Sequence, residues 1–121
     1  MTGLEDLLRR IVERVPTVQG AILVAWDGEA VASYAPTVEA VEFAIVGAQW
    51  GVVWAQIRQS LDRSRIGPPI ELFVDGERGN VLVHGVDADY SVVVTIAAGG
   101  NLALAQRELA AAVEDLRREI G

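Results

Sequence analysis

Residues 38–57 form the segment that most constrains how this chain can fold. The segment is typical of one long helix, and its apolar residues occupy nearly the whole circumference of that helix. A helix that is apolar nearly all round is buried on more than one side. A chain of 121 residues has little other material to cover the second side. We therefore expect a second copy of the same helix to cover it.

The apolar residues of this helix divide into a large set and a small set. The large residues, which we expect to face a sheet, are Phe43, Ile45, Trp50, Trp54, Ile57 and Leu61. The small residues, which we expect to form a dimer interface, are Ala40, Ala44, Gly47, Ala48, Gly51 and Ala55. Gly47 and Gly51 lie four residues apart, so they share one face and allow another backbone to come close. The alternative is that the small residues pack tightly on the chain's own sheet.

The same segment has the length of about 20 residues that a membrane span requires. A membrane span is unfavourable here because charged and polar groups near the middle of a span are costly. The segment carries four such residues: Glu39, Glu42, Gln49 and Gln56. Positions 42, 49 and 56 recur every seven residues, so they form one narrow polar stripe along the helix. We expect a helix of a soluble protein, with no membrane insertion.

Composition narrows the class of protein. The length predicts a single domain over residues 1–121. The absence of cysteine excludes disulfides and thiolate metal sites. A net charge of −7 argues against nucleic-acid binding, which needs a positive field along the contact surface. No secretory signal is visible at the N-terminus, so we expect a cytoplasmic protein.

Apolar periodicity and turn residues predict the remaining elements. The expected elements are a helix over 4–15, strands over 18–26 and 29–35, the long helix from Thr37 to within 60–69, strands over 70–75, 80–86 and 90–97, and a helix over 102–120. Thr37 and Asn101 are the expected N-caps of the last two helices, and Thr2 with Glu5 has capping-box spacing. The order α-β-β-α-β-β-β-α predicts an α+β fold. Its five-stranded antiparallel sheet should carry the long central helix on one face and the two terminal helices on the other.

This order and several short segments resemble one known family. The segments are Val15-Pro16, Val-Gln-Gly-Ala-Ile-Leu-Val at 18–24 with Asp27-Gly28, the small-residue-rich helix, and Gly99-Gly100-Asn101 before the last helix. Together they resemble the roadblock (dynein light-chain) family, and more narrowly its bacterial members that regulate small Ras-like GTPases. The resemblance covers essentially the whole chain. It implies a roadblock/profilin-like fold and a homodimer whose middle helices pack antiparallel and whose third strands pair. It also implies a small Ras-like GTPase or a larger scaffold as partner.

Two surfaces follow for such a dimer. An apolar, unpaired strand edge invites aggregation, so we expect Ile70, Leu72 and Val74 to pair across the dimer. The expected GTPase-binding residues lie on an outward stripe of the middle helix and are Glu39, Glu42, Val46, Gln49, Val53 and Gln56. The alternative for this stripe is a solvated face whose valines are packed by the second chain.

Catalysis is not indicated. His84 is the one histidine, and no nucleophile and orienting group accompany it at a spacing that predicts a catalytic set. Gly99-Gly100-Asn101 lacks the remaining residues of a phosphate-binding loop and is typical of a helix cap. We expect no catalytic residue, no metal site and no cofactor. The predicted function is a non-catalytic regulator or scaffold for a Ras-like GTPase. The alternative is a profilin-like or PAS-like sensory domain that binds a small ligand.

Overall fold

Eight elements follow one another in the expected order in the computed structural model, which describes residues 3–121. They are α1 (Gly3–Arg14), β1 (Val18–Ala25), β2 (Ala30–Tyr34), α2 (Ala40–Arg63), β3 (Glu71–Asp75), β4 (Gly79–Gly85), β5 (Tyr90–Ala97) and α3 (Leu102–Ile120). The predicted order is confirmed, and each predicted strand is found within one residue of its expected bounds. Thr2 lies outside the described residues, so its capping box stays a prediction.

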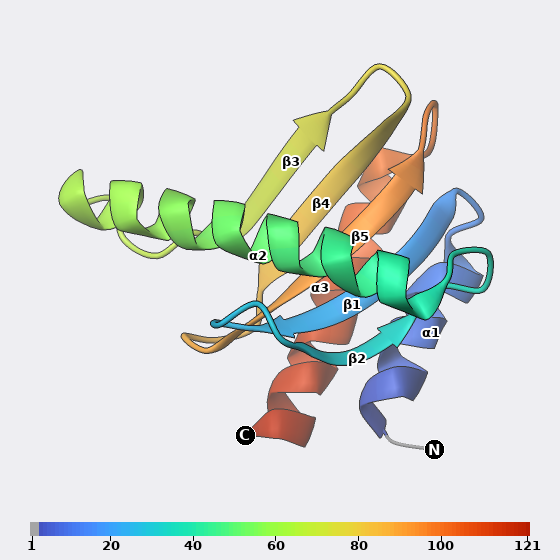
Figure 1. Cartoon of the computed structure of the whole chain (residues 1–121), viewed down its shortest axis with the longest axis horizontal. Helices are drawn as coiled ribbons and strands as arrows, with labels where there is room; N and C mark the ends of the chain where they lie inside the picture. Colours follow the sequence, from blue (N-terminus) through green and yellow to red (C-terminus); the bar gives the residue numbers. More distant parts are fainter. Residues whose placement is uncertain (1–2) are drawn as a thin grey trace.

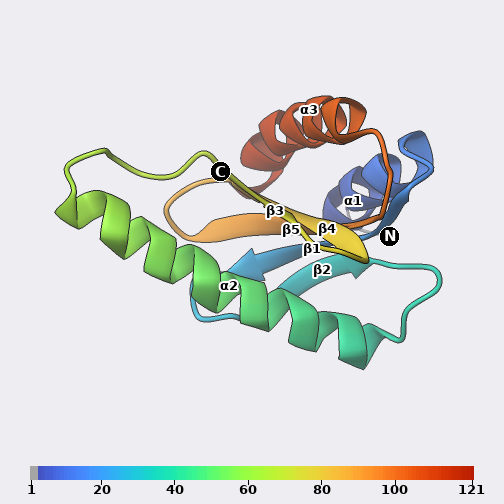
Figure 2. The same cartoon turned by 90° about the horizontal axis from the view of Figure 1, so that it is seen from above.

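The strands form one antiparallel sheet in the order β2-β1-β5-β4-β3. β2 and β3 are therefore its two edges. Figure 2 shows three layers, with α2 on one face of the sheet and α1 and α3 on the other. The predicted layering is confirmed. Figure 1 shows that α2 crosses the sheet obliquely and that its C-terminal part projects beyond the strands.

Each face of the sheet has its own apolar core because side chains alternate along the strands. On β1, Ala21 and Leu23 join the cluster beneath α1 and α3, whereas Ile22 and Val24 join the cluster beneath α2. The core beneath α2 consists of Ile22, Val24, Phe43, Trp54, Val83 and Val93. α2 thus contributes two large buried aromatic residues to the core of its own chain.

The two predicted N-caps have different outcomes. The Asn101 side-chain oxygen accepts a hydrogen bond from the Leu104 N–H at 3.1 Å, so this cap of α3 is confirmed. Thr37 is not the cap of α2: the N-cap is Glu39, without a side-chain capping bond. The reason is a turn before the helix, in which the Val38 N–H donates to the Ala35 carbonyl. This turn delays the first helical bond, from the Phe43 N–H to the Glu39 carbonyl.

An ion pair joins the two terminal helices on the far face of the sheet. Arg10 Nη2 of α1 lies 2.7 Å from Asp115 Oδ2 of α3. The hydrogen bond from Arg10, helped by the charges of Arg10 and Arg118, lowers the pKa of the Asp115 carboxyl. Because the folded-state pKa is lowered, the ionised carboxylate favours the folded state above the ordinary carboxyl pKa, and this contribution is lost as the pH falls through the lowered pKa. The far face is therefore fixed by packing and by charge.

Candidate protein-interaction site

α2 carries a row of exposed apolar side chains on the side that faces away from the sheet. Val41, Ile45 and Val52 are 65%, 54% and 57% exposed. Their spacing of four and seven residues places them on one stripe of the helix, with Ala48 between them. We call Val41, Ile45, Ala48 and Val52 the outward stripe. Contiguous exposed apolar residues of this kind mark interaction surfaces more often than isolated ones do.

A second apolar surface lies on the sheet beside α2. Ile70 precedes β3, and Leu72 and Val74 belong to it; their alternate spacing places all three on the face that α2 occupies. Val74 is opposite Val81 of β4, and Leu72 is opposite Val83. Ile70 is 73% exposed, and Figure 1 shows no helix over the outer parts of β3 and β4 on this face. The predicted dimer residues of β3 thus form one row along an open sheet edge.

The flank of α2 that faces this surface is apolar as well. Val46 and Trp50 are partly buried and pack against the core beneath α2, as do Leu72 and Val81 from the sheet. Val53 is seven residues after Val46 and shares its flank. These side chains therefore continue the apolar surface of β3 onto the helix.

The two helical glycines require a correction. A Cβ atom at Gly47 would lie 2.9 Å from Cδ1 of Ile22, and one at Gly51 would lie 3.2 Å from Cγ1 of Val24. Both glycines therefore face β1 of the same chain. The prediction that these two residues meet a second helix is wrong, because α2 needs them to approach its own sheet. The alternative, tight packing on the chain's own sheet, holds for this pair.

The other small residues of the predicted interface lie around the helix. Ala40 is exposed, and Ala44, Ala48 and Ala55 are half-buried. The prediction for Ile45 is also wrong, since this residue points away from the sheet that it was expected to face. Phe43 and Trp54 are buried as expected. The helix is apolar on both sides, so its sequence did not determine which residues face inward.

The predicted GTPase-binding residues separate into polar and apolar members. The polar members Glu39, Glu42, Gln49 and Gln56 are exposed. Val46 and Val53 are half-buried, and Val46 packs with the core beneath α2. Positions 42, 49 and 56 form a polar row that runs between the outward stripe and the flank of Val46. The structure thus brings the polar members together beside an apolar stripe that the sequence reasoning missed. The repeat at positions 41, 45, 48 and 52 was the signal that could have identified it.

His84 lies next to the C-terminal end of β4 and is 7% exposed. Its Nδ1 is 2.9 Å from the Gly85 carbonyl oxygen, which can only accept a hydrogen bond, so Nδ1 carries the hydrogen in this contact. Opposite it stand Glu71 of β3 and Val92 of β5. Among residues 3–121 no cluster of three or more histidine, cysteine, aspartate or glutamate side chains could hold a metal ion. The non-catalytic role of His84 stays a prediction.

Replacing His84 with glutamine should leave the fold nearly unchanged, and it should leave unchanged whatever partner binding the native chain shows. The change keeps a polar side chain of similar length at a buried position, so we expect a loss of about 1 kcal/mol in unfolding free energy. Thermal unfolding followed by circular dichroism measures that loss. An activity of the native chain that disappears in the folded variant would contradict the non-catalytic assignment.

Many solved structures share this fold, although no family model and no curated protein matches the sequence. A roadblock/LC7 domain from Streptomyces avermitilis superposes with a TM-score of 0.90 at 18% identity, over 98% of each chain. The chain has the roadblock/LC7 fold. Myxococcus xanthus MglB gives a TM-score of 0.88 at 14% identity, over 98% of this chain and 94% of MglB. Profilin II from Acanthamoeba castellanii gives 0.62 at 10% identity, over 95% and 99% of the two chains.

The roadblock/LC7 fold confirms the resemblance that the sequence indicated and the fold class expected from it. The lower score for profilin is consistent with a shared arrangement of sheet and helices. At these identities the comparisons concern the fold alone.

Proposed function

We propose that this chain is a non-catalytic, cytoplasmic regulator or scaffold that forms a homodimer and binds a small Ras-like GTPase. The observation that carries the proposal is the exposed apolar row on α2, with Val41, Ile45 and Val52 more than half exposed. A soluble chain that keeps such a row on a long helix has a use for it as a contact surface. The sequence resemblance supplies the class of partner.

The dimer surface in this proposal combines the β3 edge with the adjoining flank of α2. The row of Ile70, Leu72 and Val74 lies beside Val46 and Trp50 on the same apolar surface. Pairing of β3 with its copy would satisfy the edge hydrogen-bonding groups, and the second α2 would cover the flank of Val46 and Val53. A stable dimer of this kind should bury about 1,200–2,000 Å² in total. This arrangement places Val46 and Val53 in the dimer interface. The sequence had left this open as the alternative to their binding the GTPase.

The GTPase surface in this proposal is the outward stripe together with the polar row beside it. Val41, Ile45 and Val52 would supply apolar contact, while Glu42, Gln49 and Gln56 would orient the partner by hydrogen bonds. Glu39 precedes the helix and extends the polar row. In a dimer joined at the flanks of α2, the two polar rows would lie nearest to one another, with one outward stripe on each outer side of the helix pair.

The test uses the Ras-like GTPase encoded nearest to this gene, loaded with a non-hydrolysable GTP analogue or with GDP. Binding to the native dimer is measured by calorimetry, and GTP hydrolysis is measured with and without the dimer. Replacing Ile45 and Val52 together with glutamate should weaken binding by about 100-fold, because two apolar contacts become buried charges. The variant should remain a dimer.

The matched control is Ala110→Glu, which places a glutamate at an exposed position of α3, on the opposite face of the sheet from α2. It should bind like the native chain. Unchanged binding of the double variant would move the GTPase surface away from the outward stripe. No binding of either nucleotide form by the native dimer would count against a GTPase partner.

The alternative of a small-ligand sensory domain has less support. Such a domain needs an enclosed cavity with a few convergent polar groups. The hollows near the C-terminal end of α2 open to solvent, and the space directly between α2 and the middle of the sheet is filled by Ile22, Phe43, Trp54, Val83 and Val93. A ligand that binds there would have to displace buried apolar side chains.

A further inference from the structure

A hollow lies beneath the C-terminal half of α2, on the side of the helix opposite Val46. Trp26, in the turn between β1 and β2, is 75% exposed and forms one wall. Trp54 and Arg58 of α2 form the roof, and Tyr90 of β5 lines the far side. The cavity measures about 180 Å³, which is enough for one large apolar side chain. Three segments that are distant in sequence thus bring three aromatic residues to one corner of the molecule.

A second cavity lies beside the first. It measures about 340 Å³ and is lined by Pro69, Val86, Asp87 and Arg117, among others. Trp54, Arg58 and Ala88 line both cavities. The Trp54 ring is held in place by β4, because a Cβ atom at Gly85 would lie 3.0 Å from its Cζ2. We call the two cavities together the corner groove.

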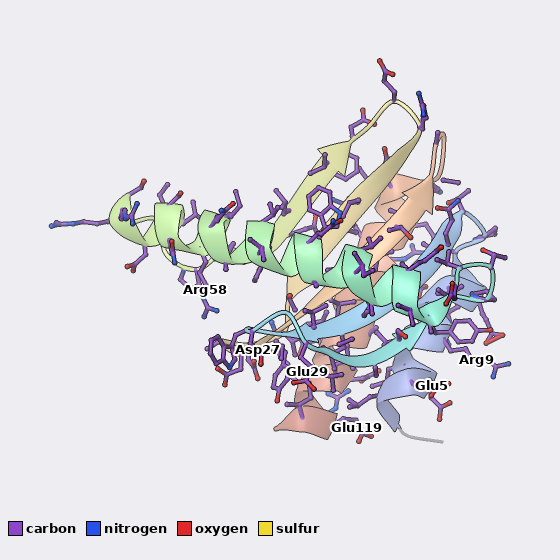
Figure 3. The ribbon with its side chains drawn as sticks, in the orientation of Figure 1. Glu5, Arg9, Asp27, Glu29, Arg58 and Glu119 are labelled. Carbon is purple, nitrogen blue, oxygen red and sulfur yellow. The ribbon has the colours of Figure 1, made fainter. Side chains whose placement is uncertain are left out.

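Arg58 is fixed at the junction of the two cavities. Its Nη1 donates a hydrogen bond of 2.5 Å to the Ala88 carbonyl, which ties α2 to the turn between β4 and β5. A guanidinium has five N–H donors, so one such bond leaves donors that can meet a main-chain carbonyl of a bound segment. Figure 3 shows Arg58 pointing from α2 toward the corner where Asp27 lies. The groove therefore has a positioned donor at its centre.

The outer rim of the groove is acidic. Asp27 and Glu29 belong to the turn that carries Trp26, and Figure 3 shows both at the same corner as Arg58. Asp89 lines the first cavity from the opposite turn. All three are exposed, and no ion pair among residues 3–121 includes any of them. A ligand that brings a cation to this rim gains charge pairing, and it can also stack on the face of Trp26.

We propose that the corner groove binds a short extended segment of a partner protein in which a large apolar residue adjoins a lysine or arginine. The apolar side chain enters the cavity between Trp26, Trp54 and Tyr90. The neighbouring basic side chain lies over Trp26 and pairs with Asp27, Glu29 or Asp89. Arg58 donates to a main-chain carbonyl of the segment. Charge complementarity favours this occupant over an acidic peptide, and the exposed tryptophan is the residue type most enriched at binding hot spots.

The second cavity shares Ile70 with the proposed dimer surface, whereas the first cavity, which holds the apolar side chain in this proposal, shares no residue with either surface of the proposed function. The first cavity faces the β1–β2 and β4–β5 turns, whereas the dimer and GTPase surfaces lie on the β3 side and the outward side of α2. Peptide binding can therefore be measured on the isolated chain without a GTPase. Its outcome and that of the GTPase experiment are independent.

The experiment selects a phage-displayed random heptapeptide library on the immobilised full chain. We expect the enriched peptides to share Leu, Ile, Phe or Trp within two positions of Lys or Arg. Synthetic copies of these peptides are then titrated by fluorescence polarisation. Trp26→Ala should weaken their binding by about 10-fold or more, as for loss of a hot-spot aromatic. Glu29→Lys should weaken binding and reduce its dependence on salt.

Val31→Ala is the matched control, since it removes an exposed apolar side chain outside the groove. It should leave the affinity unchanged. Circular dichroism confirms that both test variants are folded; Trp26 and Glu29 are exposed, so neither change removes core packing. The proposal is overturned if no peptide is enriched, if the enriched peptides are acidic or lack the basic residue, or if Trp26→Ala and Glu29→Lys bind as the native chain does.

Discussion

Replacing Gly47 with leucine is expected to destabilise each chain severely rather than to dissociate a dimer. Even a Cβ atom at this position would lie 2.9 Å and 3.1 Å from two carbons of Ile22 and 3.3 Å from Cγ2 of Val24. The whole leucine side chain has no space unless α2 moves off the sheet. Overpacking of this kind costs about 3 kcal/mol. For a domain of this size the melting temperature should fall by roughly 10 °C.

Thermal unfolding by circular dichroism at two protein concentrations measures this effect. The loss should be the same at both concentrations, since the clash occurs within one chain. Val52→Leu is the matched control, because Val52 is on the outward stripe of the same helix and should change stability by no more than about 0.5 kcal/mol. A Gly47→Leu variant that keeps the native melting behaviour but becomes monomeric would return Gly47 to the dimer interface.

The sequence predicted the order of elements because each signal is local. Asp27-Gly28 marks the first hairpin, alternation marks the strands, and Asn101 caps α3 through its own side chain. The layering followed because five strands and three helices of these lengths have few ways to cover two sheet faces. These features need no knowledge of which distant residues meet.

The orientation of α2 could not be predicted in the same way. Apolar residues surround the helix, so helical periodicity identifies no unique inward face. Gly47 is compatible with a close second helix and equally with large side chains on a strand. The choice depends on Ile22 and Val24, which fill the space beneath the helix from a segment more than 20 residues earlier. Ile45 was assigned to the core for the same reason.

The corner groove could not be predicted from the sequence for a related reason. Trp26, Trp54 and Tyr90 come from a turn, a helix and a strand, and each is ordinary in its own segment. Only the pairing of β1 with β5 and the oblique course of α2 bring them together. An exposed tryptophan next to Asp-Gly was a weak signal that this turn contacts something outside the chain.

Substituting lysine for both Leu72 and Val74 is expected to convert the proposed homodimer into a folded monomer. The two residues lie on the α2 face of β3, and the open edge of this strand has no partner among the described residues. Lysine on an edge strand blocks pairing with another chain, because two sets of ammonium groups would meet across the interface. The dissociation constant of the dimer should rise by about 100-fold or more, a change of about 2.7 kcal/mol. Light scattering coupled to size-exclusion chromatography at micromolar concentration measures the change.

Two comparisons make this result specific to β3. Val31→Lys places the same charge on β2, the opposite edge strand, and should leave the dimer intact. Val46→Glu with Val53→Glu changes the flank of α2 beside β3. This variant should also be monomeric, because in the proposed dimer the second chain covers both valines and would have to bury the glutamates. If that helix variant stays dimeric while it loses GTPase binding, Val46 and Val53 belong to the partner surface, as the sequence first indicated. A native chain that is monomeric at micromolar concentration would remove the dimer and leave the apolar row of β3 to a different partner.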